Sequence, residues 1–227
     1  MRLFPIGTIA NGSDSGTTSG VTYTFFEPNS GCKSGKVHNI LVSRFQNQTA
    51  MTRKVTDPFI QIKYDYEDIY NREFKAIENF VDSVDEALTS FLVVDFDNGK
   101  SPSSVSSVLD TWEVVIDSTD RYSSVTNYKS NKMFLWDGVS SWRIGTVSDV
   151  DTNATVTMDL TGSLFGALTL ANASAKAYVY PVYTAYLGQG ALSSFKNTEF
   201  LKENVTLGSD GGWMKSGNVE FISKYKV

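Results

Sequence analysis

Side chains able to act as nucleophiles or general bases are scarce in this chain. It has one histidine, His38, and one cysteine, Cys32. A hydrolase triad would have to pair His38 with a serine, yet the sequence contains no Gly-x-Ser-x-Gly turn. A reactive thiol needs neighbours that stabilise the thiolate, and the sequence around Cys32 shows none. We therefore predict no catalytic residue, with His38 at the surface or on an edge strand and Cys32 as an idle thiol.

Carboxylates are plentiful, but their spacing fits turns and a helix start better than a catalytic or metal site. Zinc needs three or four ligands, which one cysteine and one histidine do not provide. The stretches 95–99 and 149–153 resemble the opening of a calcium loop, and the first lacks the closing glutamate, so ordinary turns are expected. Asp65, Glu67 and Asp68 could supply glycosidase carboxylates, but a helix start also favours acids. No phosphate-binding glycine motif occurs, and we predict neither metal nor cofactor.

Two tryptophans flank a predicted hairpin turn and form the one candidate binding platform. Trp136 and Trp142 lie on either side of Asp137-Gly138, where their rings could stack against a sugar. Cross-strand aromatic packing is the more common role of such a pair. A carbohydrate-binding module that uses Trp136 and Trp142 is therefore one alternative, and an enzyme with carboxylate-only chemistry is another.

The composition favours a β-rich protein without a phosphate-binding surface. The 227 residues are 13% aromatic and rich in turn-forming types, and the formal net charge is −5. A surface built to neutralise nucleic-acid phosphates would need clustered lysine and arginine, so we predict no specific nucleic-acid partner. No apolar run approaches the roughly 20 residues of a membrane span. The single cysteine fits synthesis in a reducing cytoplasm.

The first third of the chain reads as an arm, a strand pair and a helix. Residues 1–37 are predicted to form an extended Gly/Ser-rich N-terminal arm, with turn material at its end. From Phe59 to Tyr66 apolar and polar residues alternate, which predicts a strand with one buried face, and Ile40 to Phe45 is its expected partner. The spacing of apolar residues predicts a helix over 69–88. Asp68 is its expected N-cap. The predicted buried stripe of that helix is Tyr70, Phe74, Ile77, Val81, Val84 and Leu88.

The rest of the chain is predicted to be short strands. Residues 100–110 are Ser-rich and read as a linker. The strands that follow suggest a small β-barrel inserted at 111–187. The remaining parts, 38–110 and 188–227, are predicted to form a sheet-plus-helix domain, to which a last strand at 219–225 returns. The fold class is thus mainly β (α+β). The predicted strands of the insert are 112–116, 133–136, 142–147, 154–160 and 176–187.

This order of elements resembles the distal tail and tail-tip (baseplate hub) structural proteins of long-tailed bacteriophages. A helix followed by an apolar strand, hairpins of a barrel insert and a closing strand carry the likeness. These are the segments 72–96, 134–136 with 141–145, and 218–222. The resemblance implies a belt domain that forms a six-fold ring by sheet pairing between subunits. It also implies an outward barrel that contacts other tail parts or host glycans, and it brings no catalytic residue.

The expected function is therefore structural, in the virion tail, after assembly in the host cytoplasm. The protein would form a ring at the distal end of the tail, with copies of itself, the tail tube and the tail-tip proteins as partners. Another virion ring role, as head–tail connector, stopper or tail terminator, is the nearest alternative. Ring formation is physically reasonable because an open sheet edge must be blunted or paired, and head-to-tail pairing can close a ring. Removal of 1–37 is expected to weaken assembly.

Overall fold

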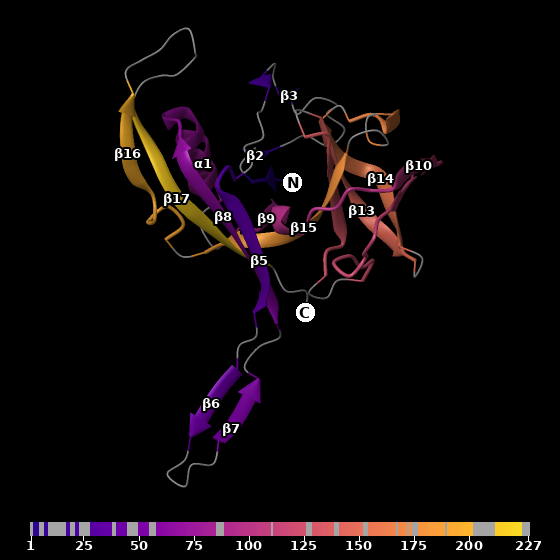
Figure 1. Ribbon diagram of the computed structural model, residues 1–227, viewed down its shortest axis with the longest axis horizontal. Coiled ribbons are helices and arrows are strands. Elements are labelled where there is room, and N and C mark those ends of the chain that lie inside the picture. The colour runs from indigo at the N-terminus through magenta and orange to yellow at the C-terminus, as the bar shows by residue number, and fades with distance from the viewer. Residues whose placement is uncertain are drawn as a thin grey trace.

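A twisted sheet assembled from strands far apart in the sequence dominates the computed structural model (Figure 1). The structure describes residues 2–4, 7–8, 17–18, 21–22, 28–37, 40–44, 50–54, 58–84, 89–109, 111–125, 129–138, 141–151, 154–166, 168–171, 173, 177–188, 190–201 and 212–223. Within these ranges the chain is mainly β with one α-helix, as the sequence predicts.

Nine strands form the continuous path of the sheet. They lie in the order β10 (Ser104–Val108), β11 (Thr111–Val115), β14 (Thr155–Gly166), β13 (Trp142–Val150), β12 (Lys132–Trp136), β15 (Tyr178–Leu187), β17 (Gly212–Ser223), β8 (Phe59–Ile69) and β5 (Gly31–Val37). Four more join it at the sides: β1 (Arg2–Leu3), β2 (Gly7–Thr8), β9 (Phe91–Val94) and β16 (Lys196–Leu201). Between the described residues, the end strands β10 and β5 do not pair, so the path is open rather than closed.

Strand β8 confirms the alternation in the sequence, but its predicted partner is wrong. Every second residue from Ile60 to Tyr66 is buried. The neighbouring strand is β5, in a continuous antiparallel register from Gly31↔Asp65 to Val37↔Phe59. Ile40–Arg44 instead forms β6, paired with β7 (Ala50–Lys54). The Gly- and Lys-containing β5 lacks an apolar pattern, yet an edge strand needs only its backbone hydrogen bonds to belong to a sheet.

The N-terminal residues are also part of the fold, contrary to a wholly extended arm. Leu3 pairs in parallel with Leu92, and the Phe4 amide donates to the Leu92 carbonyl at 3.0 Å. Both Leu3 and Phe4 are fully buried. Deleting residues 1–37 would therefore remove core side chains and β5 together. Such a deletion tests folding rather than assembly.

Helix α1 (Asn71–Ser83) covers one face of the sheet beside β8 and β17 (Figure 1). Its predicted N-cap is wrong: the cap residue is Tyr70, whose amide donates to the Glu73 carboxylate at 2.8 Å. Asp68 has a φ of 50° at the end of β8. Tyr70 is 38% exposed, and Leu88 lies outside the described residues. The buried helix face is Phe74, Ile77, Phe80, Val81 and Val84, which adds Phe80 to the predicted stripe.

The predicted linker at 100–110 contains a strand. β10 pairs with β11 along its whole length, from Ser104↔Val115 to Val108↔Thr111. Val105 is its one buried residue, so the side chains give no alternating signal. The predicted hairpin across residues 133–147 is confirmed by the β12–β13 register, with Trp136 opposite Trp142. The predicted return of the last strand is confirmed by β17, which pairs with β8.

Strand β15 joins two parts of the core. One half of β15 pairs with β12, and its later residues pair with β9 and with β17. The first apolar cluster is built by β8, α1, β9 and β17, and the second by residues between Val105 and Val179. A third cluster, which includes Leu92, Phe134 and Val182, lies where β9, β12, β13 and β15 meet. The predicted domain boundaries stay a prediction. The clusters cross them: Val105 packs in the second cluster, and Tyr183 and Leu187 pack in the first.

Candidate assembly site

A two-stranded ribbon extends the β5–β8 pair beyond the body of the molecule. β5 ends at Val37 and β8 begins at Phe59; between them lie β6 and β7, which pair from Ile40↔Lys54 to Arg44↔Ala50. In the described part of the chain neither strand pairs with any third strand. Figure 1 shows β6 and β7 away from every other labelled element. A two-stranded hairpin is marginally stable alone in water, and a third strand or a packing partner normally stabilises it.

The base of this ribbon is tied to the body by a polar cluster around the buried Asp95. Asp95, fully buried at the end of β9, accepts hydrogen bonds at Oδ2 from Ser34 Oγ on β5 (3.0 Å) and from Asn98 Nδ2 (2.9 Å). The Ser34 amide donates to Asp97 Oδ2 at 2.9 Å. The Asp97 carboxylate thereby satisfies the Ser34 N–H, a backbone donor on the outer edge of β5. The turn η1 (Phe96–Asn98) therefore blunts part of this edge, which leaves less of β5 for pairing with another chain.

Burial raises the pKa of the Asp95 carboxyl above its ordinary value, although hydrogen bonds from Asn98 and Ser34 and the Arg121 charge act the other way. Its Oδ1 has no hydrogen-bond partner among the described atoms. The folded state therefore holds the Asp95 carboxyl proton more tightly than the unfolded chain does. As a result, the stability of the fold must fall as pH rises from the ordinary pKa of an aspartate through the raised pKa of Asp95.

Asp95→Asn should remove that pH-dependent loss. We expect the free energy of unfolding of the variant minus that of the parent protein to become larger as pH rises through this window, because only the parent loses stability there. Urea unfolding at a series of pH values measures the difference. Asp149→Asn, at an exposed position on β13, is the matched control and should run parallel to the parent. If the free energy of unfolding of Asp95→Asn changed with pH in the same way as that of the parent, the raised pKa of Asp95 would be contradicted.

The single cysteine lies in β5, partly buried against the main core, rather than in a loose arm. Burial, followed by the nearby Asp95 charge, raises the pKa of the Cys32 thiol to about 12. At neutral pH this thiol is protonated and a poor nucleophile. His38 lies outside the described residues.

The candidate tryptophans are placed as a cross-strand pair with unequal exposure. Trp142 is 3% exposed and its ring packs 5.9 Å from that of Phe134. Trp136 is half-buried, with its ring 6.3 Å from Phe96. In this arrangement Trp136 offers most of the accessible ring surface of the pair. A sugar platform on both rings would need Trp142 to leave the core, and it stays a prediction.

The candidate carboxylates line one shallow depression but are directed to different partners. Asp65 forms an ion pair with Lys63 at 3.3 Å. Glu67 Oε2 accepts from the Ser30 hydroxyl at 3.3 Å, and Asp68 Oδ1 accepts from Thr198 Oγ1 at 2.6 Å. Their hydrogen bonds hold strand ends together. In the described ranges, no group of three histidine, cysteine or acidic side chains is arranged to hold a metal ion.

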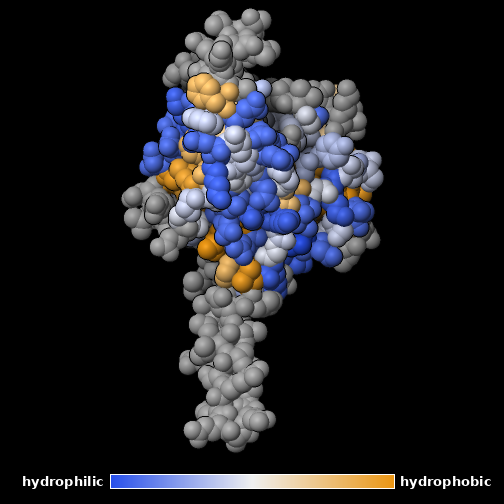
Figure 2. Space-filling view, turned by 60° about the vertical axis from the view of Figure 1, so that its left-hand side comes forward, coloured by the Kyte–Doolittle hydropathy of each residue, from blue (hydrophilic) through white to orange (hydrophobic). Residues whose placement is uncertain are grey.

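The exposed large apolar side chains of the described residues are distributed over several elements. Figure 2 shows a face of the body that is largely hydrophilic, with separate apolar areas. The sequence pattern did not indicate one exposed aromatic pair, Phe200 on β16 and Trp213 on β17. Their side chains are 57% and 48% exposed, and their ring centroids lie 5.3 Å apart. The pair lies where β16 and β17 meet the segment 202–211 that joins them. Side-chain alternation alone does not show which aromatic residues a hairpin end exposes.

No family model matches the chain, and no curated protein shows significant similarity to it. Of the helices described in the structure, none has the length and apolar character needed to cross a membrane.

Proposed function

We propose that this protein is a structural subunit that assembles with copies of itself into a ring at the distal end of a bacteriophage tail. The observation that supports self-assembly most directly is the β6–β7 ribbon. It extends from the body with no third strand described beside it. A neighbouring subunit that packs against the ribbon would supply the partner that such a hairpin lacks.

Such a contact between subunits would be able to build a ring. A ribbon on one subunit that packs on a different surface of the next subunit makes a head-to-tail contact, and a suitable rotation closes it into a ring. The belt would consist of the sheet and helix around β8 and β17, with six subunits as the proposed number. Residues 111–187 would face outward as a small β-barrel.

The proposed position at the distal tail end rests on the order of elements in the sequence. The ring would connect the tail tube to the tail-tip and receptor-binding parts. A head–tail connector, a stopper or a tail terminator would use the same kind of ring. Antibody labelling of intact virions separates these roles: label at the distal end supports the proposal, and label at the head–tail joint contradicts it.

Self-assembly is tested by the solution mass of the purified protein. We expect light scattering to give a multiple of the 25.0 kDa subunit mass. Negative-stain images of the same fraction should show a closed ring with a central hole. A mass of 25.0 kDa at every concentration tested would contradict self-assembly.

A further inference from the structure

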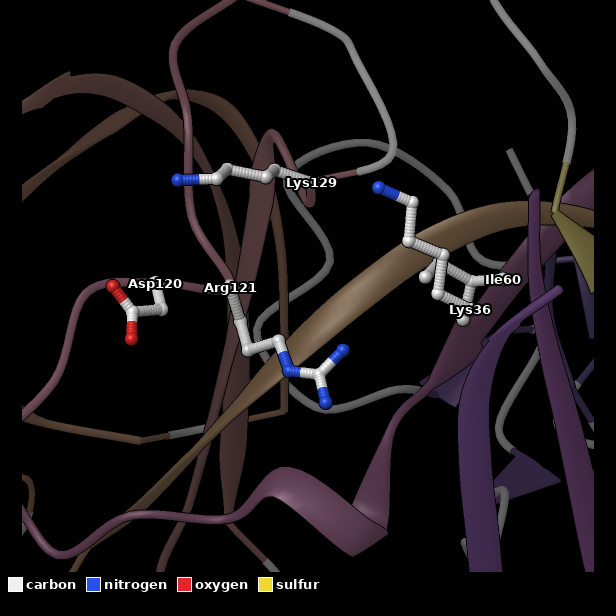
Figure 3. A pocket seen from close by; sticks show the side chains of 5 residues that line it. All are labelled: Lys36, Ile60, Asp120, Arg121 and Lys129. Carbon is white, nitrogen blue, oxygen red and sulfur yellow. The ribbon is translucent and has the colours of Figure 1, made fainter. Parts of the chain in front are cut away.

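A basic pocket lies between the base of the ribbon and the loop that joins β11 to β12. It has a volume of about 440 Å³, within the range of small-molecule sites. Strands β5 and β8 contribute one side and the loop contributes the other (Figure 3). Three of its five described lining side chains are cationic, although the whole chain has a net charge of −5. The lining residues are Lys36, Ile60, Asp120, Arg121 and Lys129.

Two of the cations are held in place by buried neighbours. Arg121 precedes Tyr122, which is 3% exposed, and Lys129 precedes Ser130, which is 1% exposed. The Ser130 amide donates to the Arg121 carbonyl at 2.7 Å, and the Ser123 amide donates to the Ser130 carbonyl at 2.8 Å. The Ser130 hydroxyl also accepts from the Val182 amide on β15 at 3.0 Å. These bonds fix the backbone that carries both charges, so little ordering is needed when a ligand binds.

The charges around the pocket favour an anion. Figure 3 shows the Asp120 carboxylate and the Arg121 guanidinium pointing away from each other. Arg121 also stabilises the charged form of the buried Asp95. Among the five described lining residues, three are cationic and one, Asp120, is acidic. A guanidinium presents a planar fork of donors that matches the oxygens of a phosphate, and lysine adds a point charge.

We infer that this pocket binds a small oxyanion of the phosphate class, with Arg121 as the principal donor and Lys129 and Lys36 as supporting charges. The inference goes beyond the proposed ring, since a single subunit contains the described pocket. Because Lys36 lies on β5 and the other cations on the β11–β12 loop, a bound anion would link the base of the ribbon to the insert.

Isothermal titration of the full-length protein with inorganic phosphate, at constant ionic strength, tests the inference. We expect saturable binding of one phosphate per chain. Arg121→Gln should weaken binding by about tenfold or more, the usual effect of losing a charged hydrogen bond. Lys129→Gln, which removes a supporting charge, should weaken binding by a smaller factor that still exceeds that of the control. Lys33→Gln is the control for the loss of one positive charge, because Lys33 is an exposed lysine of β5 that does not line the pocket. It should change the affinity less than about twofold.

Two results would overturn the inference. One is the absence of saturable phosphate binding to the parent protein. The other is an equal loss of affinity in Lys33→Gln, Lys129→Gln and Arg121→Gln, which would show only a response to net charge. Circular dichroism of each variant verifies folding, and Lys129→Gln keeps the test valid if Arg121→Gln disturbs Asp95. Neither result depends on whether the protein forms rings.

Discussion

A chain in which residues 38–58 are replaced by an Asn-Gly turn should fold normally but be a monomer in solution. The replacement removes β6 and β7 but keeps β5 and β8, whose pairing ends at Val37↔Phe59. An Asn-Gly pair suits a tight two-residue hairpin turn. The buried side chains of the three core clusters lie outside the removed segment. If neighbouring subunits hold the ribbon, its loss should abolish the ring while thermal unfolding of the subunit stays nearly unchanged.

Light scattering and negative-stain imaging of the shortened chain, beside the full-length protein, measure this outcome. Near-ultraviolet circular dichroism verifies that the core is intact. A suitable control is the full-length chain with Arg53→Ala, which changes one side chain of the ribbon and keeps the ribbon backbone. A ring with the same number of subunits from the shortened chain would show that assembly uses another surface, such as the edges of β10 or β16.

Phe221→Ala should produce the largest loss of stability that a single substitution causes in this protein, about 3–5 kcal/mol. Phe221 is fully buried on β17 at the centre of the first core cluster. Its ring centroid lies 4.7 Å from that of Phe4, 5.0 Å from Tyr64 and 6.0 Å from Phe91. Truncation leaves a cavity among four elements that are distant in sequence, and β-strands cannot easily collapse to fill it.

Urea unfolding of the ribbon-shortened chain measures this loss without a contribution from assembly. The control is Ile222→Ala on the same strand, where the side chain is 38% exposed on the opposite face. We expect Ile222→Ala to cost about 1 kcal/mol or less. Equal losses for the two variants would contradict the assignment of Phe221 to the centre of the core.

The sequence by itself determined the elements that have one buried face. The period of two in β8 and the three-to-four spacing in α1 follow from burial, which requires apolar side chains at regular positions. The β12–β13 hairpin was equally predictable, because its Asp-Gly turn lies between two apolar strands. Tyr64, Phe74 and Ile77 could be assigned to the core without coordinates.

Only the tertiary structure decided which strands pair and which polar residues meet. β5 and β10 lie at the ends of the sheet path, where backbone hydrogen bonds define a strand and side chains need no pattern. Asp68 could not be distinguished from a helix cap until its contacts with Thr198 and Ser216 were known. Lys36 and Arg121 share a pocket although 85 positions separate them (121 − 36). Hydrogen bonds and charges act over a few ångströms in space, so their partners depend on how the sheet brings distant segments together.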